Sequence, residues 1–554
     1  MRRALVLAAC AAAVLAAPAT AWAHAVLLRT VPAASKLVNA PPRSVALVFS
    51  EAVEPRFAVV SVTDAAGRQQ AAASPQRSAA DADELDVPLR SLREGWYLVF
   101  WRAISVDGHP VRGAFTFAVG PNPGPAPAFV VPSLSETAAT PTLIVLRWLV
   151  FLTAMSAIGL FVLRSAIARP LLRERPRALA SAFWVAIVGA LVFTPIYLLE
   201  ATAEFSLRSF WDIGTLVPLM QKSAFGRGYL HLELVLALFA VAGGISIWLD
   251  RGLHARRTIA ELLALAGALL AAAGVLLVPG ASGHAAQTSP RSLMLTMDWF
   301  HLASGSLWIG GLIGLLLLRR SLPALIVCVP RFSNVAFVSV AVLLGTGVIA
   351  SIVHLPTLAS LWQTSYGQAI VVKSILLLGA MALAAQNLLR TKPALGRESP
   401  PESVAVLLRR LVAGETVLVA GAIAAAAVLT SLAPPPKALA GLGSVAAHTG
   451  PGAIAETFEQ NGDKIVLHVS PNRAAVPNDF SVQLTRNGQP VRGADVTLRF
   501  TMLDMEMPSQ EYALAETAPG TYAKSLPALV MVGRWGLALG INGPTTTIVD
   551  RAGG

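Results

Sequence analysis

Hydrophobic and polar residues alternate in two separate stretches of the chain, one near each end. This period of two is typical of β-strands with one buried face. In the second stretch, Asn487-Gly488 is a strong signal for a two-residue hairpin turn. We therefore expect two small β-sandwiches, each of about 100 residues. The alternating residues are Val45, Leu47, Phe49, Trp96, Leu98, Phe100, Phe115, Phe117 and Val119 in the first stretch, and Ile465, Leu467, Val469, Phe480, Val482, Leu484, Val496, Leu498 and Phe500 in the second.

Eight apolar runs lie between the two stretches, and each is long enough to cross a bilayer as a helix. The predicted fold class is a multi-domain membrane protein with a β-sandwich, an eight-helix transmembrane bundle and a second β-sandwich. We place the first sandwich at 24–120, an extended Pro-rich linker at 121–140, the bundle at 141–432 and the second sandwich at 455–550. The runs cover about 141–163, 178–200, 229–249, 258–279, 293–318, 333–353, 368–389 and 411–432.

Composition and charge support a membrane protein and set its orientation. The chain is 55% hydrophobic and 13% charged, whereas a soluble domain is normally about 25% charged. The net charge of +12 comes largely from alternate loops of the bundle. If the first sandwich is outside the cell membrane, sixteen loop arginines and lysines face the cytoplasm and four face outward. The positive-inside rule therefore places both sandwiches in the periplasm of a bacterial inner-membrane protein. The bilayer is a partner, and nucleic acid is not.

The first 23 residues are typical of a signal peptide. Arg2 and Arg3 precede an apolar run, and Ala21-Trp22-Ala23 fits a cleavage site that leaves His24 as the first residue. The alternative is a lipoprotein box ending at Cys10, but its apolar run is shorter than a signal needs. The other cysteine, Cys328, falls in a predicted cytoplasmic loop. The exported parts would then have no thiol for a disulfide or a metal.

His24, Asp107 and His109 form a candidate metal site in the first sandwich. A mature N-terminal histidine offers its α-amine and its imidazole, Asp107 adds an oxygen and His109 a third nitrogen. This mixture of nitrogen and oxygen ligands suits Cu(II), and Gly108 lets the chain bend between the two later ligands. The alternative is that Asp107-Gly108 is only a turn and His24 only a chain end. A histidine placed directly after the cleavage site favours the metal.

The same stretches resemble the periplasmic copper protein family CopC. The matching pieces are His24 to Ala33, Leu47 to Glu51 and Ser105 to Gly113. The resemblance implies that His24, Asp107 and His109 bind Cu(II). It also implies that Glu51 is an acid near the metal, which could orient the amine. The methionine-rich Cu(I) sites of some CopC proteins are not matched.

Ionisable residues inside the predicted spans are candidate transport residues, because they are costly in lipid. Asp298 and His301 lie three residues apart, on one face of the fifth span. Lys373 and Glu415 are also inside the membrane, as a structural ion pair or as transport residues. Imidazoles and thioethers near the periplasmic mouth suit copper, but histidines at span ends can be merely interfacial and methionines merely core. The residues expected at this mouth are His231, His284, His301, His354, Met294 and Met297.

The membrane region resembles CopD, the membrane partner of CopC, over most of 141–432. The most specific piece runs from His301 to Trp308-Ile309-Gly310-Gly311. The resemblance implies a role in moving copper into the cytoplasm. The second sandwich resembles the YtkA-like modules joined to some CopC–CopD chains. In it, Met502 continues the core side of a strand, whereas Met505 and Met507 either hold Cu(I) or pack as ordinary side chains.

The predicted function is copper binding in the periplasm and copper import across the inner membrane, in copper homeostasis or resistance. Copper ions and periplasmic copper donors are the expected partners. One alternative is sequestration or sensing of copper without transport. A copper oxidase is disfavoured, because Asp107 would stabilise Cu(II) whereas redox turnover needs both oxidation states. We therefore do not expect an enzyme.

Overall fold

The computed structural model divides into a helical unit and a β unit. The predicted head residues His24, Glu51, Asp107 and His109, together with the signal peptide, His284, Met505 and Met507, lie outside the described residues. The structure describes residues 27–34, 36–49, 52–104, 110–124, 140–171, 176–250, 256–282, 290–395, 402–432, 434–435, 439–440, 442–443, 445–474, 476–503, 509–526, 528–530 and 533–553.

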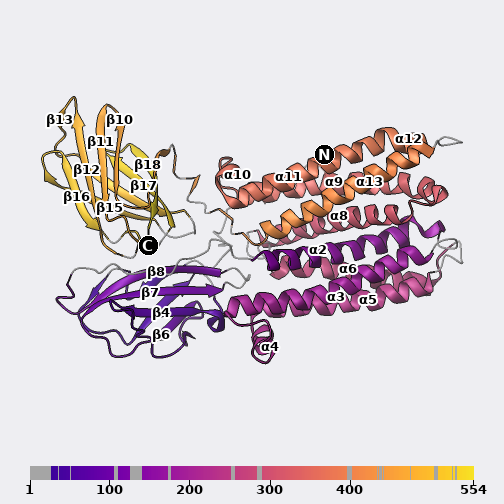
Figure 1. Cartoon of the computed structure of the whole chain (residues 1–554), viewed down its shortest axis with the longest axis horizontal. Coiled ribbons are helices and arrows are strands. Elements are labelled where there is room, and N and C mark those ends of the chain that lie inside the picture. The colour runs from indigo at the N-terminus through magenta and orange to yellow at the C-terminus, as the bar shows by residue number, and fades with distance from the viewer. Residues whose placement is uncertain are drawn as a thin grey trace, which may run out of the picture. The chain divides into compact units, whose positions relative to one another are not determined.

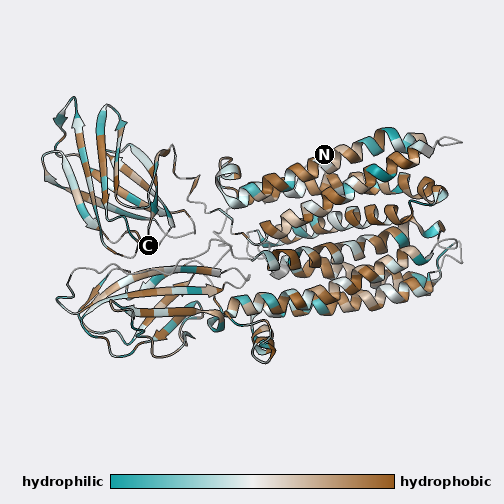
Figure 2. Ribbon diagram, viewed as in Figure 1, coloured by the Kyte–Doolittle hydropathy of each residue, from teal (hydrophilic) through white to brown (hydrophobic). Residues whose placement is uncertain are grey.

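Eight helices in the described part of the chain are long and apolar enough to cross a membrane. They run side by side (Figure 1), and hydrophobic residues cover most of their faces (Figure 2). The predicted eight-helix bundle is therefore confirmed. The helices are α2 (Pro141–Val162), α3 (Pro176–Ser206), α5 (Ala224–Leu249), α6 (Ile259–Ser282), α8 (Arg291–Leu317), α9 (Leu322–His354), α11 (Ser365–Gln386) and α13 (Glu402–Leu429).

Shorter elements join or extend these helices. Two π-helices continue them, η2 (Leu163–Ile167) after α2 and η4 (Asn387–Thr391) after α11. The others are η3 (Arg169–Leu171), α4 (Ile213–Lys222), α10 (Ser360–Gln363) and α12 (Lys392–Leu395). One loop prediction is wrong, because Cys328 is fully buried inside α9. The helix begins before the apolar run because Leu325 and Val329 also pack into the bundle core, although Arg331 lowers the hydropathy there.

The first sandwich consists of two four-stranded sheets. Phe49 and Trp101 come from different sheets, and their rings meet edge to face with centroids 5.4 Å apart. The core predicted from Val45, Leu47 and Phe49 is confirmed, since all three are buried. One sheet has the order β1 (Leu27–Val31), β3 (Ser44–Phe49), β6 (Glu84–Pro88), β5 (Gln76–Arg77), and the other has the order β2 (Leu37–Val38), β8 (Pro110–Val119), β7 (Gly95–Ile104), β4 (Val59–Asp64).

The core-facing side of strand β7 differs from the prediction. The alternation of Trp96, Leu98 and Phe100 suggests that these residues face the core, but the other side of the strand does. Tyr97, Val99 and Trp101 lie in the main core. Leu98 instead forms a small separate cluster on the other face, against which Trp96 and Phe100 pack. Both faces of this strand are apolar, so alternation alone could not select the buried one. Pairing with β8, whose Phe117 lies opposite Tyr97, identifies the core face.

The second β region contains ten linked strands in its described part, and β15 pairs with both β14 and β16. Phe480 of β12 and Phe500 of β14 pack together in its core, with ring centroids 4.9 Å apart. The hairpin predicted at Asn487-Gly488 is confirmed, with φ of 49° and 80°. Met502 is buried, as expected. The strands are β9 (Val445–Thr449), β10 (Ile454–Gln460), β11 (Asp463–Ser470), β12 (Asn478–Arg486), β13 (Gln489–Pro490), β14 (Val496–Met502), β15 (Gln510–Ala518), β16 (Thr521–Leu526), β17 (Gly533–Ile541) and β18 (Thr545–Ala552).

Candidate functional site

Helix α8 carries four of the predicted transport residues on one face. Met294, Met297, Asp298 and His301 follow the spacing i, i+3, i+4 and i+7, which keeps side chains on one side of a helix. Met294 is buried, and the other three are half-buried. His301 lies ten residues after the first residue of α8, about 15 Å along the axis at 1.5 Å per residue. Its imidazole is therefore well inside the span.

His301 uses its two ring nitrogens differently. Its Nδ1 lies 2.8 Å from the hydroxyl of Thr346 on α9. That hydroxyl donates to the carbonyl of Val342 at 2.7 Å, so it accepts the Nδ1–H of the imidazole. This network assigns the proton to Nδ1 and leaves a lone pair on Nε2. The pattern resembles the way metal-binding histidines are oriented by a second hydrogen bond.

The Nε2 atom of His301 faces a lysine on a third helix. Lys373 of α11 places its Nζ 3.3 Å from Nε2. Asp298 interacts electrostatically with the same ammonium group. The Oδ2 atom of Asp298 also lies close to α6, where a Cβ added to Gly280 would approach it to 2.6 Å. Side chains of α8, α9 and α11 thus meet in one cluster, and α6 closes it beside Asp298.

Another intramembrane acid belongs to a separate, deeper network. Glu415 of α13 is 3% exposed. It accepts a hydrogen bond from Trp308 Nε1 at 2.7 Å and a longer one, at 3.4 Å, from Asn387 Nδ2. Of the two alternatives for Lys373 and Glu415, the structural ion pair is therefore wrong, since Lys373 turns to His301. Sequence spacing could not find either partner, because both contacts join helices far apart in the chain.

Close packing against three neighbouring helices explains the residue types of the segment Trp308-Ile309-Gly310-Gly311. Trp308 donates to α13, as described. Gly310 lies against Gly159 of α2, where an added Cβ would come within 2.4 Å of its Cα. Gly311 faces Phe332 of α9, and an added Cβ would overlap its ring. This piece holds α8, and with it His301, against three neighbouring helices.

Of the other residues predicted at the periplasmic mouth, His354 lies outward of the His301 cluster and His231 lies apart from it. The ring of His354, the last residue of α9, packs edge to face on that of Tyr366, with centroids 6.4 Å apart. Tyr366 precedes Lys373 by two helical turns, so His354 lies outward of the His301 cluster. His231 is exposed near the start of α5, on a helix that takes no part in the described contacts of the cluster. The structure brings Asp298 and His301 together and leaves His231 apart.

The described flanks of the predicted head ligands meet at one end of the first sandwich. Leu27, which follows the segment with His24, pairs with Phe49, which precedes the segment with Glu51. The amide of Glu54 donates to the carbonyl of Ile104 at 3.2 Å. Ile104 pairs with Pro110 across the connection that contains Asp107 and His109. The three segments that contain the predicted head residues are therefore joined to the sandwich at neighbouring positions.

Three family models match successive parts of the chain. The CopC domain matches residues 27–120, Copper resistance protein D matches 326–429 and the YtkA-like family matches 458–540. The second match is narrower than the expected 141–432. It includes Thr346, Lys373 and Glu415 and excludes Asp298 and His301.

Known proteins resemble either the whole chain or its first domain. The Copper transport protein CutJ of Bacillus subtilis (strain 168) is 26% identical over 94% of this chain and 93% of that protein. Protein YobA of Escherichia coli (strain K12) is 40% identical over 18% of this chain and 80% of that protein. The crystal structure of CopC from Methylosinus trichosporium OB3b is 33% identical and covers 18% of this chain and 98% of that one, with a TM-score of 0.17.

These features define a multi-pass membrane protein that handles copper. A CopC domain, a Copper resistance protein D domain and a YtkA-like domain follow one another in this chain, which is similar over almost its whole length to a copper transport protein. Copper is its ligand. The CopC and CopD families consist of transport and resistance proteins, so this chain is not an enzyme.

Proposed function

We propose that this protein captures Cu(II) in the periplasm with its CopC-like domain and imports copper across the inner membrane through its CopD-like domain. The observation that carries the proposal is the cluster of His301, Thr346, Lys373 and Asp298 inside the bundle, in which Thr346 is buried and the other three are half-buried. Ionisable groups inside spans are costly and mark ion pathways. The similarity to CutJ, which is named a copper transport protein, supports the same conclusion.

The geometry of His301 suits a copper ion in passage. A neutral imidazole with a free Nε2 lone pair is a good copper ligand, and Thr346 holds the ring in that tautomer. Copper at Nε2 would displace the ammonium of Lys373, which lies 3.3 Å away. Asp298 supplies negative charge beside the incoming cation. In the described part of the chain, no three His, Cys, Asp or Glu side chains come together, which favours transit over tight storage.

The outer face of α8 supports an entry route. Met294 and Met297 lie two turns and one turn outward of His301 on the same face, and thioethers bind Cu(I). His354 lies at the same end of the bundle, at the end of α9. We infer that copper enters between these residues before it reaches His301. Copper held as Cu(II) by the proposed head site would take up one electron from an external reductant, such as a cellular thiol, before the thioethers bind it as Cu(I).

The orientation rests on charge and on the number of spans. Between the apolar runs, sixteen arginines and lysines fall in the connections after the first, third, fifth and seventh runs, and four fall in those after the second, fourth and sixth, which favours the first set as cytoplasmic. An even number of spans then returns the chain to the periplasm, so both sandwiches are proposed to be periplasmic. Met505 and Met507 of the second one are proposed as a weaker Cu(I) site.

The test is copper accumulation by cells at limiting external copper. We expect His24→Ala and His301→Ala each to reduce cytoplasmic copper, because both residues lie on one path. The matched control is His468→Ala, since His468 is an exposed strand residue of the last domain. If uptake were unchanged in both variants while periplasmic copper binding fell in His24→Ala, the protein would sequester or sense copper and the import proposal would fail.

A further inference from the structure

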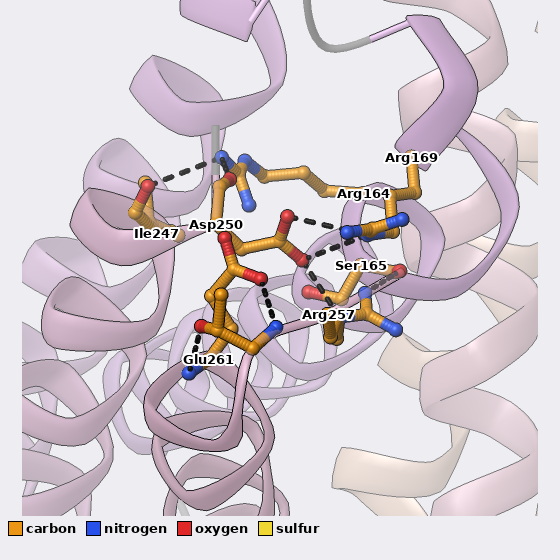
Figure 3. Close-up of polar contacts among 8 residues, drawn as sticks. Arg164, Ser165, Arg169, Ile247, Asp250, Arg257 and Glu261 are labelled. Atoms are coloured by element: carbon orange, nitrogen blue, oxygen red, sulfur yellow. Dashed lines mark hydrogen bonds and ion pairs between the residues drawn. The ribbon is translucent and has the colours of Figure 1, made fainter. Parts of the chain in front are cut away.

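A buried arginine network lies at the opposite end of the bundle from the His301 cluster. Here α2 continues as the π-helix η2, which contains Arg164. Figure 3 shows Arg164 reaching past Asp250 to the end of α5. Its Nη2 donates to the carbonyls of Ile247 and Asp250 at 3.2 and 2.8 Å. Arg164 therefore caps the C-terminal carbonyls of α5, where a positive charge is favoured.

Asp250 is the carboxylate at the centre of this network. It lies 3.2 Å from Arg169 and 2.8 Å from Arg257. Burial alone would raise the pKa of Asp250, but the hydrogen bonds and charges of Arg257 and Arg169 outweigh it and hold the pKa below its usual range. The carboxylate is therefore ionised at neutral pH. It compensates only part of the charge of three guanidinium groups.

The positive charge around Asp250 exceeds the negative charge. Arg331 of α9 adds a fourth guanidinium, which donates to the carbonyl of Ile167 at 3.4 Å. Glu261 accepts from the backbone N–H of Thr258 at 2.7 Å, so it caps its own helix. The segments 163–177 and 250–261 together contain eight arginines and three acids. This end of the bundle therefore attracts anions.

Arg164 also has donors that the protein leaves unused. Its side chain is 1% exposed, and neither Nε nor Nη1 has a hydrogen-bond partner among the described residues. Buried polar groups are nearly always satisfied, because an unpaired donor in the interior is destabilising. The N–H groups of a guanidinium are strong hydrogen-bond donors to the oxygens of a phosphate group. The unused donors thus indicate an acceptor supplied from outside the chain.

We propose that Arg164 and its neighbours Arg169 and Arg257 bind the phosphate of an anionic membrane phospholipid. The network lies where η2 ends at Ile167, α5 ends at Leu249 and α6 begins at Ile259. Span ends lie at the level of the lipid headgroups, and basic pockets between helices at that level suit anionic headgroups. The bound lipid would tie the ends of α2, α5 and α6 together.

The test uses the purified full-length protein, delipidated in detergent, and native mass spectrometry. Phosphatidylglycerol, phosphatidylcholine and inorganic phosphate are titrated separately. We expect the wild type to retain phosphatidylglycerol in preference to phosphatidylcholine. Arg164→Gln should weaken that binding about tenfold or more, the usual effect of losing a charge-assisted hydrogen bond. The matched control, Arg320→Gln, removes an exposed arginine at the end of α8 and should bind as the wild type does.

Arg164→Lys keeps the charge and removes the unused Nε and Nη1 donors, so its affinity should fall between those of wild type and Arg164→Gln. It also tests the site if Arg164→Gln fails to fold. If inorganic phosphate bound in an Arg164-dependent way and displaced the lipid preference, the ligand would be free phosphate. If the wild type showed no preference for the anionic lipid, or the Arg164 variants bound as Arg320→Gln does, Arg164 would be only a structural cap and the proposal would be overturned.

Discussion

At the residue scale, the hydroxyl of Thr346 decides which nitrogen of His301 is available. Thr346→Val keeps the shape of the side chain and removes the acceptor of the Nδ1–H, leaving a buried donor unpaired. We expect copper uptake at limiting copper to fall about 10- to 100-fold, the usual cost of losing a group that orients a metal ligand. The measurement is the initial rate of copper uptake in reconstituted vesicles.

Thr416→Val is the matched control for that change. Thr416 also bonds the carbonyl four residues earlier in its own helix, at 2.7 Å to Val412, as Thr346 does to Val342. We expect Thr416→Val to transport as the wild type does. Equal uptake by wild type, Thr346→Val and Thr416→Val would show that the tautomer of His301 does not matter for transport.

Asp550 provides a prediction on pH in the last domain. The side chain is 0% exposed, and its Oδ1 accepts from Asn472 Nδ2 at 2.9 Å. Burial raises the pKa of Asp550, and the hydrogen bonds from Asn472 and Thr449 only partly offset it. The folded state therefore binds this proton more strongly than the unfolded state. The stabilising contribution of Asp550 is therefore fully present below its pKa in the unfolded state. It is lost as the pH rises through its pKa in the folded state.

Asp550→Asn should remove that part of the pH dependence, because an amide of the same shape is neutral at every pH. Relative to wild type, the variant should gain stability as pH rises from about 4 to about 7, the range above an ordinary carboxyl pKa. The measurement is hydrogen exchange of β17 and β18, corrected for the intrinsic effect of pH. A constant difference between the two proteins at all pH values would contradict the assignment to Asp550.

The sequence could predict residues on one helix but not partners across helices. Asp298 and His301 were expected on one face, because they lie three positions apart on a predicted span. Lys373 and Glu415 were recognised as intramembrane, but the alternative that they form an ion pair was wrong. Their real partners, His301 and Trp308, lie at sequence separations of 72 and 107, and no periodicity within a helix encodes such contacts. Nothing in the sequence marked Thr346 as a partner of His301, since threonine is common in helices of membrane proteins.

At the element scale, the crossing of α2 and α8 depends on two glycines. An added Cβ on Gly159 would lie 2.0 Å from the carbonyl of Ser306 and 2.7 Å from Cα of Gly310. Small residues allow such close approach of membrane helices. Gly159→Ala should therefore separate the helices and cost about 1–3 kcal/mol or more. Thermal unfolding of the purified protein measures the loss.

Gly267→Ala is the control at this scale, because a Cβ on Gly267 of α6 would meet nothing within 4 Å. It should be neutral or stabilising, by up to about 1 kcal/mol from helix propensity. If Gly159→Ala unfolded at the same temperature as Gly267→Ala, the close crossing would contribute little to stability.

Helix number was predictable from the sequence, and helix length was not. Each of the eight apolar runs became a spanning helix, because only a helix satisfies its own backbone in lipid. The start of α9 at Leu322 and that of α13 at Glu402 were missed. Arg331, Arg409 and Arg410 lower the hydropathy at these ends, but the backbone hydrogen bonds continue through them. Hydropathy measures the lipid-facing part of a helix and not the part that extends beyond it.

At the scale of the whole molecule, one chain joins a proposed capture site to a proposed membrane route. Joining two sites by a linker makes the second encounter intramolecular, with an effective concentration of about millimolar for a short flexible linker. The linker predicted at 121–140 would give the head and the bundle such an effective concentration. The head should therefore contribute most to copper uptake when external copper is scarce. The His301 cluster should be needed for uptake at every copper concentration.

This difference gives a dose-dependent prediction. Uptake by His24→Ala should fall at limiting copper and recover as external copper approaches the effective concentration that the head would have supplied. Uptake by His301→Ala should stay low throughout, because added copper cannot replace a ligand inside the span. Copper uptake measured over a range of external concentrations separates the two. If high copper restored both variants, His301 would lie off the route. If it restored neither, the head would contribute more than capture, since free copper should reach the mouth unaided.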